Sequence, residues 1–233
     1  MSHADDWVVL DLSDGPIWER AFFVHSLVLI GTLEANGNPD FAPKHMVTPL
    51  GCGNWFGFVC TPRHSTFQNI QRDGCFTVSY PPPDQVLLTS LAASPRNEYC
   101  DKPNLSAIAS RPARLVDGVV VDDCPFYLEC ELDRIVDGFD HYALIVGRIV
   151  AAQARPVVLR DVDRDDAEIV RQHPLLAYLA PGRFASIHHS QGFPFRKDFT
   201  NEGIGPACAG SSRSSGGSAN RISDPLGGIG NTD

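Results

Sequence analysis

The feature that most limits the fold of this chain is its series of short strand-like runs separated by turns. Three such runs, LVLIGTLE (27–34), FAPKHMVTPLG (41–51) and NWFGFVC (54–60), follow one another with an Asn36-Gly37 turn after the first. Further β-rich runs lie at 75–80, 113–122, 125–137, 141–154 and 183–189. This spacing is typical of a closed barrel and unlike that of alternating βαβ units, so the sequence predicts a mainly β fold.

Short helices are expected at the joints between these runs. In residues 15–24, Ile17, Trp18, Ala21 and Phe22 share one face, which predicts an amphipathic helix. Two more helices are expected, one over residues 84–94 with Asp84 as its cap and one from Asp163 to His173. Residues 95–112 are polar and irregular and resemble a surface loop or lid.

A basic, hydroxyl-rich turn follows the run that ends at residue 60. Ser65 and Gln68 have the spacing of a capping box, and Gly74 stands where a helix ends, so we expect a short helix over residues 66–73. The first turn of such a helix offers unpaired N–H groups, and Arg63 lies just before it. This arrangement predicts a site for a phosphate monoester. The alternative is an ordinary capped helix beside a solvated arginine.

Composition excludes several classes of function. The net charge of −9 over 233 residues argues against a nucleic-acid-binding surface, and no apolar stretch reaches membrane-spanning length. The seven cysteines are odd in number and form no C-x-x-C pair, which favours reduced thiols in a cytoplasmic protein. Residues 201–233 are rich in Gly, Ser and Asn and are expected to form a flexible tail after a single domain over residues 1–200.

Several of these segments together resemble one family. Thr32, Asn36-Gly37 and Ala42-Pro43, followed by CTPRHSTFQNI and GCFTVSY, are similar to the flavin reductase-like proteins of the FMN-binding split barrel. The resemblance resumes at DHYALIVGRIV (140–150) and LLAYLAPGRFASI (175–187), so it covers roughly residues 22 to 190. It implies a Greek-key split β-barrel with short peripheral helices, a bound FMN and a homodimer.

The resemblance also implies which residues bind the cofactor. The strand after Ala42-Pro43 is expected to lie along the isoalloxazine, and the basic turn is expected to hold the flavin phosphate. The candidate cofactor-binding residues are Lys44, His45, Met46, Val47, Thr48, Thr61, Arg63, His64, Ser65, Thr66 and Asn69.

No catalytic residue is assigned, because a flavin carries the hydride or electron transfer itself and the protein binds and orients it. Lys44 could stabilise the anionic reduced flavin, or could be a solvated strand lysine. His141 could contact the flavin or a nicotinamide, or could be structural. No metal site is expected, because the Asp161, Asp163 and Asp165 series lacks the glycine and closing glutamate of a calcium loop.

Three classes of function remain open. The first is an FMN-dependent oxidoreductase that passes electrons from NAD(P)H to an unknown acceptor. The second is an FMN-binding electron carrier or sensor without a dedicated nicotinamide site. The third is a flavin-free barrel that acts as a binding or assembly module, against which the Arg63-Ser65-Thr66 turn speaks.

Overall fold

A computed structural model describes residues 7–98 and 102–194. The tail expected at residues 201–233 lies outside these described residues, as does the end of the domain expected at residue 200.

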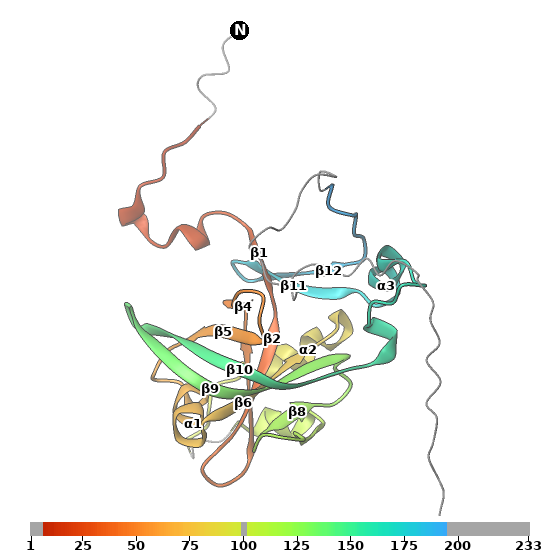
Figure 1. Cartoon of the computed structure of the whole chain (residues 1–233). Coiled ribbons are helices and arrows are strands. Elements are labelled where there is room, and N and C mark those ends of the chain that lie inside the picture. The colour runs from red at the N-terminus through yellow and green to blue at the C-terminus, as the bar shows by residue number, and fades with distance from the viewer. Residues whose placement is uncertain (1–6, 99–101, 195–233) are drawn as a thin grey trace, which may run out of the picture. The chain divides into compact units, whose positions relative to one another are not determined.

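The main sheet has seven antiparallel strands in the order β3-β2-β6-β9-β10-β5-β4 (Figure 1). The strands are β2 (Val28–Leu33), β3 (Pro39–Lys44), β4 (Val47–Pro49), β5 (Trp55–Cys60), β6 (Cys75–Tyr80), β9 (Phe126–Phe139) and β10 (Tyr142–Ala154). The turn between β2 and β3 is the expected one, with Gly37 at φ +82 and its N–H bonded to the carbonyl of Glu34 at 2.8 Å. The turn predicted at Asn36-Gly37 is therefore confirmed.

The two edge strands of this sheet, β3 and β4, are consecutive in the chain. Only His45 and Met46 separate them, and a link of that length spans about 10 Å. The sheet therefore has to curl until its edges approach each other, and the N–H of Val59 on β5 bonds the carbonyl of Met46 at 2.9 Å. This curl confirms the barrel and corrects one detail, because the single strand expected over residues 41–51 is two strands on opposite edges.

A second, three-stranded sheet has the order β1-β11-β12, and it replaces the helix expected over residues 15–24. Its strands are β1 (Phe23–Ser26), β11 (Leu175–Ala180) and β12 (Arg183–Ile187). Between residue 7, where the described part of the chain begins, and β1, the helical elements are two single-turn 3-10 helices, η1 (Leu12–Asp14) and η2 (Ile17–Glu19). The helix prediction was wrong: within residues 15–24, Ile17–Glu19 form a single 3-10 turn, and Phe23 and Val24 are in β1 because they pair with β11, which no local pattern reveals. The strand β11 itself was not predicted.

The helices are short and lie between strands. They are α1 (Ser65–Asp73), α2 (Val86–Leu91) and α3 (Asp166–Gln172), with 3-10 turns η3 (Pro83–Gln85), η4 (Pro103–Ala107) and η5 (Pro156–Val158). Asp165 caps α3 by accepting a bond from the N–H of Ala167 at 2.9 Å, whereas Asp84 does not cap α2. No helix among the described residues is long and apolar enough to cross a membrane.

Strand β2 is buried on both faces, because a core cluster lies on each side of it. Val28 and Ile30 face the barrel interior, where the rings of Phe58 and Phe76 pack edge to face at 5.3 Å. Leu29 faces the second cluster, which includes Phe41 of β3, Ala92 directly after α2 and residues of β8 (Val119–Val121). The short strand β7 (Ser110–Pro112) pairs with β8. Two-sided burial explains the continuous apolar run in this part of the sequence.

Glu129 on β9 is a fully buried carboxylate that accepts most of its hydrogen bonds from backbone groups. Its oxygens accept hydrogen bonds from the N–H groups of Arg114, Leu115 and Val116 at 2.6 to 3.2 Å. The side-chain amide of Gln153 adds a bond at 3.3 Å. A buried charge needs such partners, so Glu129 holds the loop before β8 against the barrel.

The cysteines only partly follow the expectation of reduced thiols. Cys60, Cys75, Cys124 and Cys130 are free and buried, where they pack as small apolar residues. Burial raises the pKa of Cys124 and of Cys130 to about 12, so these thiols stay protonated. Cys52 is disulfide-bonded, and the expectation was wrong at this position.

Candidate functional site

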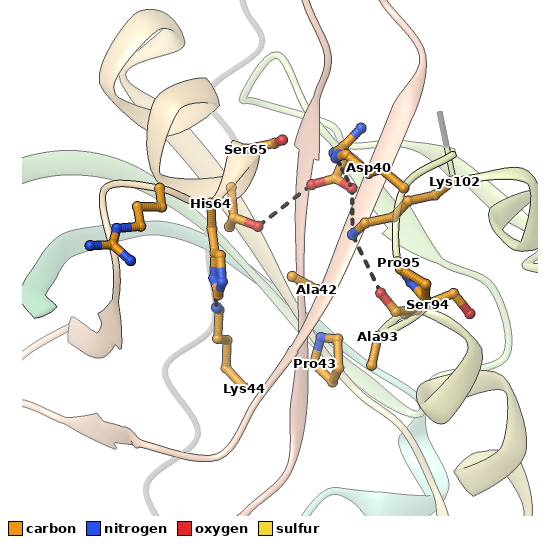
Figure 2. Close-up of a pocket in the computed structure, with 14 residues that line it drawn as sticks. Asp40, Ala42, Pro43, Lys44, His64, Ser65, Ala93, Ser94, Pro95 and Lys102 are labelled. Atoms are coloured by element: carbon orange, nitrogen blue, oxygen red, sulfur yellow. Dashed lines mark hydrogen bonds and ion pairs between the residues drawn. The ribbon is translucent and has the colours of Figure 1, made fainter. Parts of the chain in front are cut away.

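A cavity of about 380 Å³ lies where β3, the start of α1 and the segment after α2 meet (Figure 2). Segments far apart in the sequence therefore form its walls. The lining residues are Asp40, Ala42, Pro43, Lys44, Arg63, His64, Ser65, Thr66, Ala92, Ala93, Ser94, Pro95, Arg96 and Lys102.

The helix α1 begins with backbone donors that have no internal partner. His64, with φ −85 and ψ +139, is the N-cap, and its side chain makes no capping bond. The capping box expected at Ser65 is not formed, because Ser65 is already the first helical residue and the Gln68 amide bonds the carbonyl of Pro62 at 3.2 Å. Within the described part of the chain, no hydrogen bond is made by the backbone N–H groups of Ser65 and Thr66. These donors remain available to an anion.

The end of the helix follows the prediction. Gly74 is in the left-handed region at φ +70, and its N–H bonds the carbonyl of Ile70 at 2.9 Å. The observed span, Ser65–Asp73, extends the expected helix by one residue. The helix is therefore placed as expected even though its cap differs.

Lys44 and His64 face each other across one side of the cavity (Figure 2). The Nζ atom of Lys44 lies 3.5 Å from Nδ1 of His64. Burial, together with the ammonium groups of Lys44 and Lys102, lowers the pKa of His64, and Asp40 partly opposes this effect. A neutral imidazole can accept a hydrogen bond from Lys44 through Nδ1, which leaves Nε2 as the donor.

Asp40 is the centre of a buried ion-pair cluster on the other side of the cavity. Its side chain is 1% exposed, and Oδ1 lies 2.9 Å from Nζ of Lys102 and 3.2 Å from a guanidinium nitrogen of Arg96. Its Oδ2 accepts a bond from the hydroxyl of Thr66 at 3.5 Å. Nζ of Lys102 also donates to the carbonyl of Phe41 at 3.0 Å. The cluster therefore ties β3 to the start of α1 and to the segment after α2.

The cavity is positively charged although the whole chain is acidic. Lys44, Arg63, Arg96 and Lys102 line it, against the one lining carboxylate of Asp40. The guanidinium of Arg63 has no hydrogen bond or ion pair among the described residues. A local excess of cations beside free N–H donors fits a phosphate monoester, because both features favour an anion.

Five of the residues expected to bind the cofactor come together in this cavity. They are Lys44, Arg63, His64, Ser65 and Thr66.

Two others support the turn without lining the cavity. Thr61 shapes the turn, since its hydroxyl accepts a bond from the N–H of Arg63 at 3.5 Å and its carbonyl one from the N–H of His64 at 3.1 Å. Asn69 is buried and donates to the hydroxyl of Thr32 on β2 at 3.1 Å. It therefore fixes α1 to the sheet.

The remaining four candidates, His45, Met46, Val47 and Thr48, do not line the cavity, because the chain leaves β3 after Lys44. The ring of His45 lies 4.4 Å from that of Tyr178 and 5.6 Å from that of His25.

His141 lies in the exposed turn between β9 and β10, also outside the lining. The pairing of β10 with β5 nevertheless brings this turn close to the cavity. Ala143 on β10 pairs with Cys60 on β5, which leads directly into the turn that carries Arg63.

Sequence reasoning missed Asp40, Arg96 and Lys102. Asp40 stands between the apolar residues of a strand, where a buried carboxylate requires a cation. The supposed surface loop over residues 95–112 contains both cations. A carboxylate within a strand and cations within a loop were the available signal in the sequence. Nothing in the local sequence, however, indicates which carboxylate pairs with which cation.

Among the described residues, no group of three or more His, Cys, Asp or Glu side chains could hold a metal ion.

The fold is shared with several proteins of known structure. A 2-nitrobenzoate 2-nitroreductase of Pseudomonas fluorescens aligns with a TM-score of 0.69 and 16% identity over 84% of this chain and 100% of its own. A flavoredoxin of Desulfovibrio vulgaris (Miyazaki F) aligns at 0.66 and 18% over 82% and 99%. An NADH:FAD oxidoreductase of Streptomyces globisporus C-1027 aligns at 0.56 and 13% over 70% and 86%. At these identities the likeness establishes the fold.

The sequence itself matches a family model. A search of curated proteins found no match. The model of the flavin reductase like domain matches residues 20–178, which include the strands β2 to β10, α1 and all of the cavity residues. The chain therefore belongs to the flavin reductase-like family, and its function is that of a flavin-related oxidoreductase.

Proposed function

We propose that this protein is an FMN-dependent oxidoreductase that takes electrons from NAD(P)H. The observation that carries the proposal is the start of α1, where the N–H groups of Ser65 and Thr66 and the guanidinium of Arg63, none of which has a partner among the described residues, adjoin one another in one cavity. Such a turn is suited to the terminal phosphate of a flavin mononucleotide.

Different cavity residues would contact the phosphate and the ring of a bound flavin. Arg63 and the first turn of α1 hold the phosphate, whereas Ala42 and Pro43 on β3 offer an apolar wall for a flat ring. When bound, the flavin supplies the hydride and electron transfer. Lys44 contributes positive charge near the ring, which favours the negative charge that a flavin gains on reduction.

Two features support FMN over FAD. The cavity has one anion-binding turn and a volume of about 380 Å³, near the lower end of the roughly 300–1,000 Å³ common for small-molecule sites. FAD is the alternative cofactor, because one protein of similar fold is an NADH:FAD oxidoreductase. Titration of the apoprotein with FMN, FAD and riboflavin separates these cases, and a preference for FAD would refute this assignment.

The nicotinamide donor is supported by the same oxidoreductase, which uses NADH. An electron carrier without its own nicotinamide site is the second candidate, supported by the similar flavoredoxin. The test is an anaerobic visible spectrum of the FMN-loaded protein after addition of NADH or NADPH. Rapid bleaching of the flavin band supports the oxidoreductase. Bleaching by dithionite alone supports the carrier.

We also propose a homodimer. Apolar side chains on the three-stranded sheet and before it are exposed, including Trp18 at 54%, Phe22 at 66%, Val24 at 68% and Phe184 at 54%. An exposed apolar face of this kind is usually covered, and an isologous pair is the commonest way to cover it. Light scattering should give twice the mass of the chain. A stable monomer that still holds FMN would refute the dimer.

A further inference from the structure

A second cavity of about 590 Å³ lies directly beside the first. Its lining includes the apolar side chains of Pro39, Leu105 and Ile108 and the polar side chains of Asn36 and Asn38. Its dimensions and mixed lining are those of a site for part of an organic ligand. Nothing in the proposed binding of FMN uses it.

The two cavities share three lining residues, Asp40, Arg96 and Lys102. These residues form the ion-pair cluster described above, here named the wall. Arg96 also pairs with Glu34, which lines the second cavity only. Its guanidinium thus bridges the carboxylates of Asp40 and Glu34 and closes the wall on the side of the second cavity.

The phosphate end of the first cavity touches this wall. Thr66, at the start of α1, donates to Oδ2 of Asp40 at 3.5 Å, and Figure 2 shows Asp40 and Lys102 together on the side away from Lys44 and His64. A ligand that continued beyond its phosphate toward the second cavity would have to pass between Asp40, Arg96 and Lys102. These side chains are held to one another at 2.9 and 3.2 Å.

We propose that this wall determines flavin selectivity: it admits FMN and keeps the nucleotide half of FAD out of the second cavity. The inference rests on the proposed function. FAD differs from FMN by an AMP group joined through a pyrophosphate, so that group requires room immediately beyond the phosphate.

Arg96→Ala tests the wall, with Arg63→Ala as the matched control. Arg96 lines both cavities, whereas Arg63 lines only the first. The measurement is the dissociation constant of each apoprotein for FMN and for FAD, and the readout is their ratio. Any phosphate contact that both flavins share cancels in this ratio.

Wild type should bind FMN at least tenfold more tightly than FAD. Arg96→Ala should reduce this preference at least fivefold, whereas Arg63→Ala should weaken both flavins and leave the preference unchanged. Arg96→Gln, which shortens the side chain and removes its charge, serves if the alanine variant fails to fold, and it should shift the ratio in the same direction.

Equal binding of FMN and FAD by wild type, or an unchanged ratio in both Arg96 variants, would overturn the role of the wall while leaving a flavin-binding protein. Failure of wild type to bind any flavin would overturn the proposed function as well. The two failures are therefore distinguishable.

Discussion

The ammonium nitrogen of Lys44 lies 3.5 Å from Nδ1 of His64, although twenty positions separate these residues in the sequence. Lys44 is the last residue of β3 and His64 is the cap of α1, so the contact joins the two elements that would hold the ring and the phosphate of a flavin. It also makes the charge of His64 responsive to the ligand, because an arriving anion offsets the repulsion from Lys44.

The first prediction concerns Arg63. Arg63→Ala should lower the affinity for FMN by about ten- to hundredfold, since a charge-assisted hydrogen bond is worth about 1.5–3 kcal/mol. The affinity for riboflavin, which has no phosphate, should fall much less. Arg171→Ala, which removes an exposed arginine of α3, is the control and should change neither affinity. Calorimetric titration of both flavins gives the answer, and equal losses for both would mean that the turn is only a helix start.

The second prediction concerns His64 and pH. Its lowered pKa leaves the imidazole neutral in the free protein near pH 7, and a protonated imidazole would attract the flavin phosphate. The advantage of wild type over His64→Gln in FMN affinity should therefore grow as the pH falls from 8 to 6. Comparing the two proteins at each pH removes the titration of the phosphate itself. A pH-independent advantage, or the same trend with riboflavin, would contradict this role.

The third prediction concerns stability and His45. Burial, with smaller effects from His25 and Lys44, lowers the pKa of His45 below its ordinary value of about 6.5. The unfolded chain then binds the proton more readily, so the stability present above about pH 6.5 is lost as the pH falls through the folded pKa. Thermal melting should show a larger drop between pH 7.5 and 5.5 in wild type than in His45→Gln. Parallel curves would rule out this contribution.

The fourth prediction concerns the buried carboxylate on β9. Glu129→Ala should cost about 3 kcal/mol or more of unfolding free energy, because it removes the fully buried acceptor of three backbone N–H groups and a hydrogen bond to a charged group is worth about 1.5–3 kcal/mol. Glu129→Gln keeps one acceptor oxygen and should cost less. Glu131→Ala, two residues further on the same strand, removes an exposed ion pair with Arg148 and should change little. Urea denaturation of the three variants measures these losses of unfolding free energy. A loss for Glu129→Ala no larger than that for Glu131→Ala would contradict the prediction.

Local physics was sufficient for much of this protein. Gly74 ends α1 in the left-handed region, and Asn36-Gly37 turns the chain between β2 and β3, because each of these depends on a few neighbouring residues. Arg63, Ser65 and Thr66 could be assigned to one turn for the same reason. The apolar runs of β5, β6 and β10 likewise predicted strands, since burial of alternate or successive side chains leaves its pattern in the sequence.

Long-range pairing decided the rest. Phe23 and Val24 are in a strand rather than a helix because β11 supplies their hydrogen-bonding partners. The His45-Met46 link crosses between the two edges of the curled sheet, which removes four expected residues from the cavity. Asp40 meets Lys102 only after β3 and the segment beyond α2 have packed together. A buried charge indicates in the sequence that it needs a partner, but only the tertiary structure selects that partner, because ion pairs depend on distance in space and not on distance along the chain.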